Sequence, residues 1–136
     1  MYKVLKIHKY AATRDVELEN VDTGTIDLCF DHSATVSLEN FNFMVEGEVY
    51  DCKILLLDGF KVEKTTKSVE VNIADLNAIV GERRCWKITI GQDVYYVPLS
   101  QTKDVDINGK LYYDIMRKDL VQVDGVIHAD CLRNTR

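Results

Sequence analysis

Residues 15–31 read DVELENVDTGTIDLCFD, and this stretch shows which kind of secondary structure to expect. Apolar and polar residues alternate on both sides of Asp22-Thr23-Gly24, with Val16 and Leu18 before it and Leu28 and Phe30 after it. Alternation with a period of two is typical of a strand with one buried face, and a glycine suits the positive-φ position of a short hairpin loop. The stretch therefore predicts a β-hairpin.

The alternation also predicts the register of this hairpin. A three-residue loop at Asp22-Thr23-Gly24 places Leu18 opposite Leu28, and thereby keeps the apolar residues on one side. The other side then carries a face of acids, on which like charges lie directly opposite one another and destabilise the sheet. The acids expected on this face are Asp15, Glu17, Glu19, Asp27 and Asp31.

Strand patterns continue over most of the chain. Short runs rich in β-branched and aromatic residues recur, and Asn108-Gly109 and Asp124-Gly125 are two-residue hairpin signals. Two short helices are expected, over residues 38–45 after Ser37 and over residues 76–80 between Asp75 and Gly81. Residues 47–54 resemble residues 81–88 in sequence, and this internal similarity indicates either a duplication or a chance match.

The order of these elements resembles OB-type small β-barrels over the first 60 residues or so. The resemblance rests on a strand, a hairpin, a short helical connection and the step Val45-Glu46-Gly47-Glu48-Val49-Tyr50. It implies an all-β, OB-like or related small antiparallel barrel or sandwich, extended here by C-terminal hairpins. OB-type barrels often bind nucleic acid on aromatic and basic strands. Because the matching hairpin is acidic and Phe30 is its only aromatic residue, no binding residue is transferred.

Length and composition bound the class of protein. With 136 residues and 46% apolar content, we expect a single domain over residues 1–136, with a possible sub-boundary near residues 60–68. The N-terminus lacks a secretory core and no apolar run could span a bilayer, so we expect a cytoplasmic protein, of bacterial or phage origin. Four widely spaced cysteines are then expected to be free thiols.

The charges are strongly segregated along the chain. Residues 15–51 contain ten carboxylates and no lysine or arginine, whereas residues 1–14 contain four bases and no acid. An acidic face speeds encounter with basic partners and can mimic phosphate charge. We therefore expect a non-enzymatic binding protein that engages a basic protein surface, as an inhibitor, an immunity-type antidote or a nucleic-acid mimic would. The simpler alternative is a solvated face that is neutralised by the N-terminal strand.

Two other functions are kept as alternatives. A nucleic-acid-binding barrel could stack bases on later aromatic and basic residues, namely Arg83, Arg84, Trp86, Lys87, Tyr95 and Tyr112. A zinc protein or small hydrolase could use Cys29, His32, His128 and Cys131, because two thiolates and two imidazoles suit tetrahedral zinc. No nucleophile motif or phosphate-binding glycine loop is present, so neither an enzyme nor another cofactor is expected.

Overall fold

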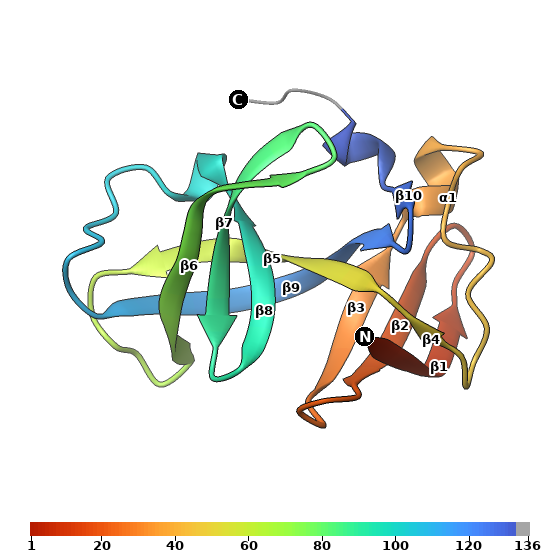
Figure 1. Cartoon of the computed structure of the whole chain (residues 1–136), viewed down its shortest axis with the longest axis horizontal. Coiled ribbons are helices and arrows are strands. Elements are labelled where there is room, and N and C mark those ends of the chain that lie inside the picture. The colour runs from red at the N-terminus through yellow and green to blue at the C-terminus, as the bar shows by residue number, and fades with distance from the viewer. Residues whose placement is uncertain (133–136) are drawn as a thin grey trace.

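The computed structural model describes residues 1–132 and is built almost entirely of strands (Figure 1). The strands are β1 (Tyr2–Lys9), β2 (Arg14–Asn20), β3 (Ile26–Asp31), β4 (Val49–Tyr50), β5 (Cys52–Lys61), β6 (Ser68–Val80), β7 (Arg83–Ile90), β8 (Asp93–Pro98), β9 (Leu111–Val123) and β10 (Val126–Ile127). The helical turns are α1 (Ser33–Val36), η1 (Leu99–Gln101) and η2 (Ala129–Cys131). The predicted β-rich fold class is confirmed.

Five strands close into a small barrel. The ring runs β9–β5–β8–β7–β6 and returns to β9, where Val69 of β6 pairs with Tyr113. The predicted small barrel is therefore confirmed, but the strands that close it are β5 to β9. The first three strands form an antiparallel sheet beside it, and β3 joins β9 in parallel through Phe30 and Asp119.

The long strands β5 and β9 belong to both halves of the molecule and cross it from side to side (Figure 1). Only Asp51 separates β4 from β5, so the path β1–β2–β3–β9–β5–β4 also returns to β1. Each half thus has a three-stranded meander, a short helical turn and a long strand, in that order. The internal sequence similarity of residues 47–54 and 81–88 does not match this structural repeat. Gly47 precedes β4, whereas Gly81 lies in the turn between β6 and β7.

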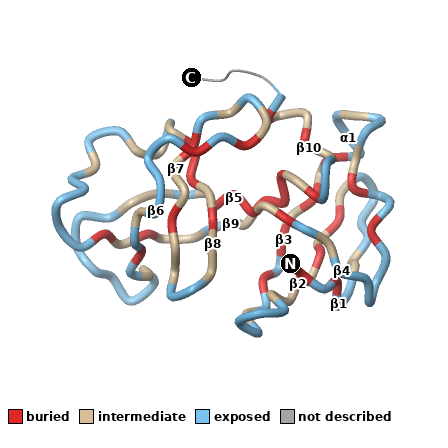
Figure 2. Tube along the Cα trace, in the orientation of Figure 1, coloured by how far each residue is buried: buried red, intermediate tan, exposed pale blue. Residues whose placement is uncertain are grey.

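One apolar core runs through both halves. Its buried residues include Val16 and Leu18 of β2, Leu56 of β5, Val97 of β8 and Tyr113 of β9. Figure 2 shows that buried residues lie along the strands, while exposed residues cover the loops at both ends. The shared core packs the β2–β3 hairpin against β9.

The local predictions failed where a tertiary partner decides the structure. Residues 76–80 were expected to be helical but form the end of β6, because Ala78 and Val80 pair with β7. Residues 38–45 are irregular, and α1 instead begins at Ser33. The Asp124-Gly125 hairpin is confirmed, whereas the expected strand before Asn108-Gly109 is irregular.

None of the helices within residues 1–132 has the length and apolar character needed to cross a membrane.

All four cysteines are free and buried. Burial raises the pKa of the Cys85 thiol to about 11 and that of Cys52 to about 12, so both are protonated at neutral pH.

Candidate functional site

The β2–β3 hairpin has a different register from the predicted one. Asp15 pairs with Phe30, Glu17 with Leu28 and Glu19 with Ile26, one residue away from expectation. The loop contains four residues, Val21–Gly24, since the Asn20 N–H donates to Thr25 O (2.8 Å). The Asn20 side-chain oxygen also accepts the Asp22 N–H (2.9 Å), which stabilises the longer loop. A slip of one residue moves every side chain of a strand to the other face.

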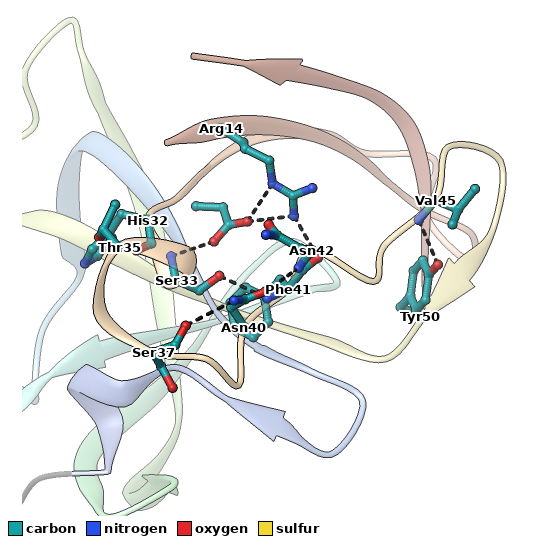
Figure 3. A network of polar contacts seen from close by, with 11 residues as sticks. Arg14, His32, Ser33, Thr35, Ser37, Asn40, Phe41, Asn42, Val45 and Tyr50 are labelled. Carbon is teal, nitrogen blue, oxygen red and sulfur yellow. Dashed lines mark hydrogen bonds and ion pairs between the residues drawn. The ribbon is translucent and has the colours of Figure 1, made fainter. Parts of the chain in front are cut away.

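Asp27 and Asp31 therefore point into the protein, and the predicted face of five acids is wrong. Their exposed fractions are 1% and 2%, respectively. Arg14 donates to Asp31 Oδ2 through Nε (3.0 Å) and Nη2 (2.8 Å), and the Ser33 N–H donates to Oδ1 (2.9 Å). Arg14 Nη2 also donates to Phe41 O (2.7 Å; Figure 3), which attaches the loop after α1 to the hairpin. Both carboxylates are therefore buried in the protein and not presented on the outer surface of the hairpin.

Asp27 connects the two halves of the molecule. Its carboxylate accepts a hydrogen bond from the Tyr95 hydroxyl of β8 (2.8 Å). It also forms an ion pair with Lys118 Nζ of β9 (2.5 Å). Burial and the Asp27 carboxylate together raise the pKa of Tyr95, so its hydroxyl remains a donor. A buried carboxylate with two such donors is compensated for the loss of water.

The outer surface of the hairpin carries acids on β2 and apolar side chains on β3. Leu28 is 53% exposed, and Ile26 and Phe30 lie beside it on the same face of β3. On β9, Met116 is 80% exposed and borders, with Leu28 and Phe30, an open pocket of ≈ 330 Å³. We call this surface the hairpin face; it consists of Asp15, Glu17, Glu19, Ile26, Leu28, Phe30 and Met116.

Both edges of the hairpin face are charged. On β1, Lys3, Lys6 and His8 pair with Glu19, Glu17 and Asp15, respectively. His8 Nε2 lies 2.7 Å from Glu17 Oε2, and the Tyr10 hydroxyl donates to Asp15 (3.1 Å). On the β9 side, the Arg117 guanidinium lies 4.6 Å from the centre of the Phe30 ring. The N-terminal bases thus lie beside the acids, as the simpler alternative predicted.

The residues predicted to stack bases do not form a shared exposed row. Tyr95 is buried, with its hydroxyl on Asp27. Trp86 packs against Phe60 (5.6 Å between ring centres), which packs against Tyr113 (5.0 Å). These contacts are cross-strand aromatic packing. Arg84 is exposed, whereas Arg83, Lys87 and Tyr112 are half-buried.

Only part of the predicted zinc set is brought together. Cys29 packs in the main core, and Cys131 packs in a second cluster with Val80 and Cys85. His32 and His128 do meet, with ring centres 4.3 Å apart. Asp130 joins them, since its Oδ2 lies 3.1 Å from His32 Nε2. Burial and the neighbouring His32 lower the pKa of His128.

Sequence reasoning missed the roles of several charged residues. Arg14 was counted only as one of the N-terminal bases, and Met116 and Lys118 lay between the stretches expected to be strands, 110–115 and 120–123. Asp130 lies between His128 and Cys131 and could have been considered with them, because carboxylates are ordinary zinc ligands. Arg14 contacts Asp31, and Lys118 contacts Asp27. These partners lie 17 and 91 residues away in the chain, where no local pattern could connect them.

The comparisons with known proteins add no relative. No protein-family model matches this chain, and searches of curated proteins and of solved structures found no match. Its function has to be argued from its own residues.

Proposed function

We propose that this chain is a non-enzymatic binding protein that engages a basic protein partner through the hairpin face. The observation that supports this is the apolar row on β3, in which Ile26 and Leu28 are exposed and Phe30 is half-buried, with the exposed Met116 beside it. Protein interfaces typically have an apolar or aromatic centre surrounded by charged residues. The hairpin face has this arrangement.

The three acids on β2 favour a basic partner. Asp15, Glu17 and Glu19 each pair with a residue of the apolar row, so a partner seated on that row would meet the carboxylates. The same carboxylates would repel a phosphate backbone. With Asp27 and Asp31 inside, three acids remain on this face, and apolar contact is expected to contribute more than charge mimicry.

A quantitative capture experiment tests the apolar part. The chain is immobilised and used to retain partners from extracts of its own host, at low and high salt. We expect Leu28→Ser to reduce retention of the specific partner at least tenfold. Leu38→Ser is the matched control, because Leu38 is fully exposed in the loop after α1 and lies outside the hairpin face. Equal retention by wild type and Leu28→Ser would exclude this face.

The acidic part has its own matched pair of variants. Asp15→Lys, Glu17→Lys and Glu19→Lys together should weaken retention and lower its salt dependence. Reversing Glu39, Glu46 and Glu48, which are exposed in the loop between α1 and β4, changes the net charge by the same amount and should have little effect. If both triple variants lose the partner to the same extent, the partner is held by the net charge of the chain and not by the three acids of the hairpin face. A low-salt gel shift with nucleic acid should show no retardation.

A further inference from the structure

We propose that His32, His128 and Asp130 form a binding site for a zinc ion, independent of the hairpin face. One nitrogen of each imidazole and one oxygen of the carboxylate lie within 4.8 Å of one another. His32 is the residue after β3, His128 is the residue after β10, and Asp130 lies in the turn η2. The parallel pairing of β3 with β9 brings these segments together, although His32 and Asp130 are 98 residues apart.

The separations between these atoms are already close to those of a metal site. Asp130 Oδ2 lies 3.1 Å from His32 Nε2 and 3.8 Å from His128 Nδ1. Ligands of a tetrahedral zinc ion with bonds of 2.0–2.1 Å are about 3.4 Å apart. Small side-chain movements would therefore bring all three donors to bonding distance. His128 Nδ1 accepts the Asp130 N–H (3.0 Å), and a zinc ion on Nδ1 would replace this one hydrogen bond.

His128 is the buried member of the set, with a side chain that is 1% exposed. Its Nδ1 faces Asp130 and is the proposed ligand. Its Nε2 is the one buried side-chain nitrogen or oxygen within residues 1–132 that lacks a hydrogen-bond partner, and it is not one of the proposed ligands. The site therefore rests on the positions of His128 Nδ1, His32 Nε2 and Asp130 Oδ2.

The surrounding charges leave Asp130 available. The two neighbouring buried carboxylates are each held by an arginine, Asp31 by Arg14 and Asp119 by Arg117. Asp130 contacts only the two histidines through its side chain, and it is 45% exposed there. A cation can thus enter from solvent and gain one negative ligand that no lysine or arginine of residues 1–132 neutralises.

The donor set selects the class of metal. Two imidazoles and one carboxylate suit zinc and similar transition metals, whereas magnesium and calcium prefer all-oxygen sites. Three protein ligands leave a fourth position for water or an external ligand. Cys29 and Cys131, the other members of the predicted zinc set, are buried in separate clusters and do not contribute.

Zinc titration of untagged, chelator-treated protein against a chromophoric chelator tests this site. We expect one zinc ion per chain, and at least 100-fold weaker binding in His32→Gln and in Asp130→Asn. His8→Gln is the matched control, because His8 also contacts a carboxylate (Glu17, 2.7 Å) but stands alone on β1. It should bind zinc as the wild type does. Millimolar magnesium or calcium should not compete.

A second measurement needs no variant. On addition of zinc, the ring resonances of His32 and His128 in NMR spectra should shift, and those of His8 should not. Zinc affinity that is unchanged in His32→Gln or Asp130→Asn would overturn the proposal. It would also fail if the wild type binds zinc no more tightly than about 100 μM, if the His8 resonances alone respond, or if magnesium competes.

Discussion

Arg14 and Asp31 form a buried ion pair that joins the first residue of β2 to the last residue of β3. Arg14 Nη2 and Asp31 Oδ2 are 2.8 Å apart, and their side chains are 11% and 1% exposed. The same guanidinium also holds Phe41 O (Figure 3). The pair thus fixes the hairpin and the loop after α1 in one arrangement.

Replacing Arg14 should therefore be strongly destabilising. Arg14→Ala leaves the Asp31 carboxylate buried without its counter-ion, and breaking a buried pair in this way typically costs about 3–5 kcal/mol. Urea unfolding followed by circular dichroism measures this change. Lys9→Ala, at the exposed end of β1, is the control and should change the free energy of unfolding by less than about 0.5 kcal/mol. A cost below about 1 kcal/mol for Arg14→Ala would contradict the role given to the pair.

The contact between Tyr95 and Asp27 should also be measurable. Tyr95→Phe removes one hydrogen bond to a buried carboxylate, which is worth about 1.5–3 kcal/mol. Tyr96→Phe is the matched control, because the Tyr96 hydroxyl makes no hydrogen bond within residues 1–132, whereas the Tyr95 hydroxyl does. Equal midpoints in urea for the two variants would show that the connection between the halves does not depend on this bond.

Two glycines with nearly the same positive φ should respond differently to alanine. Gly81 has φ +60°, and a Cβ there would lie 2.5 Å from Cys131 O and 2.8 Å from Ile127 Cγ2. Gly91 has φ +59° and open space around it. We expect Gly91→Ala to cost about 1–2 kcal/mol from the left-handed conformation alone. Gly81→Ala should cost about 1–3 kcal/mol more, because its clash is with backbone. Thermal unfolding of both variants checks the difference.

The buried thiols predict that stability falls at alkaline pH. Burial raises the pKa of Cys85 from 9.0 to about 11, so the folded state keeps the proton that the unfolded state loses. The stabilisation is complete below about pH 9 and is lost as the pH rises toward 11, with a slope of about 1.4 kcal/mol per pH unit for one proton. Cys85→Ala should flatten the pH dependence of the unfolding free energy between pH 9 and 11. An unchanged slope would mean that Cys85 does not titrate differently in the two states.

The strands were predictable because their signal is local. A strand with one buried face alternates apolar and polar residues, and residues 15–19 and 26–31 show this pattern directly. The Asp124-Gly125 turn has an equally local cause, since Asp124 adopts φ +51°, and this segment forms the predicted hairpin. Residues 76–80 carried helix signals, but pairing with β7 overrides such weak preferences.

The candidate sites depended on contacts that no local pattern contains. Alternation alone allowed Leu28 and Asp27 to exchange faces, and the longer hairpin loop decided that Leu28 is outside. Asp27 can be buried because Tyr95 donates a hydrogen bond to it and Lys118 forms an ion pair with it. These two residues lie 68 and 91 positions away in the chain. The pairing of His32 and His128 was anticipated, but their partner Asp130 was not.

Local patterns are enough to predict a β-rich protein with segregated charge, because alternation, turn residues and composition act over a few neighbouring positions. They do not say which strands close the barrel: the resemblance placed it in the first 60 residues or so, whereas β5 to β9 close it. The tertiary structure alone decided the register of the β2–β3 hairpin, and with it which acids are buried and which apolar residues face solvent. It also decided that His32, His128 and Asp130 meet. The physical reason is that a strand pattern is unchanged when its two faces are exchanged. Only the packing of distant strands, and the satisfaction of the charges between them, selects one face as the interior.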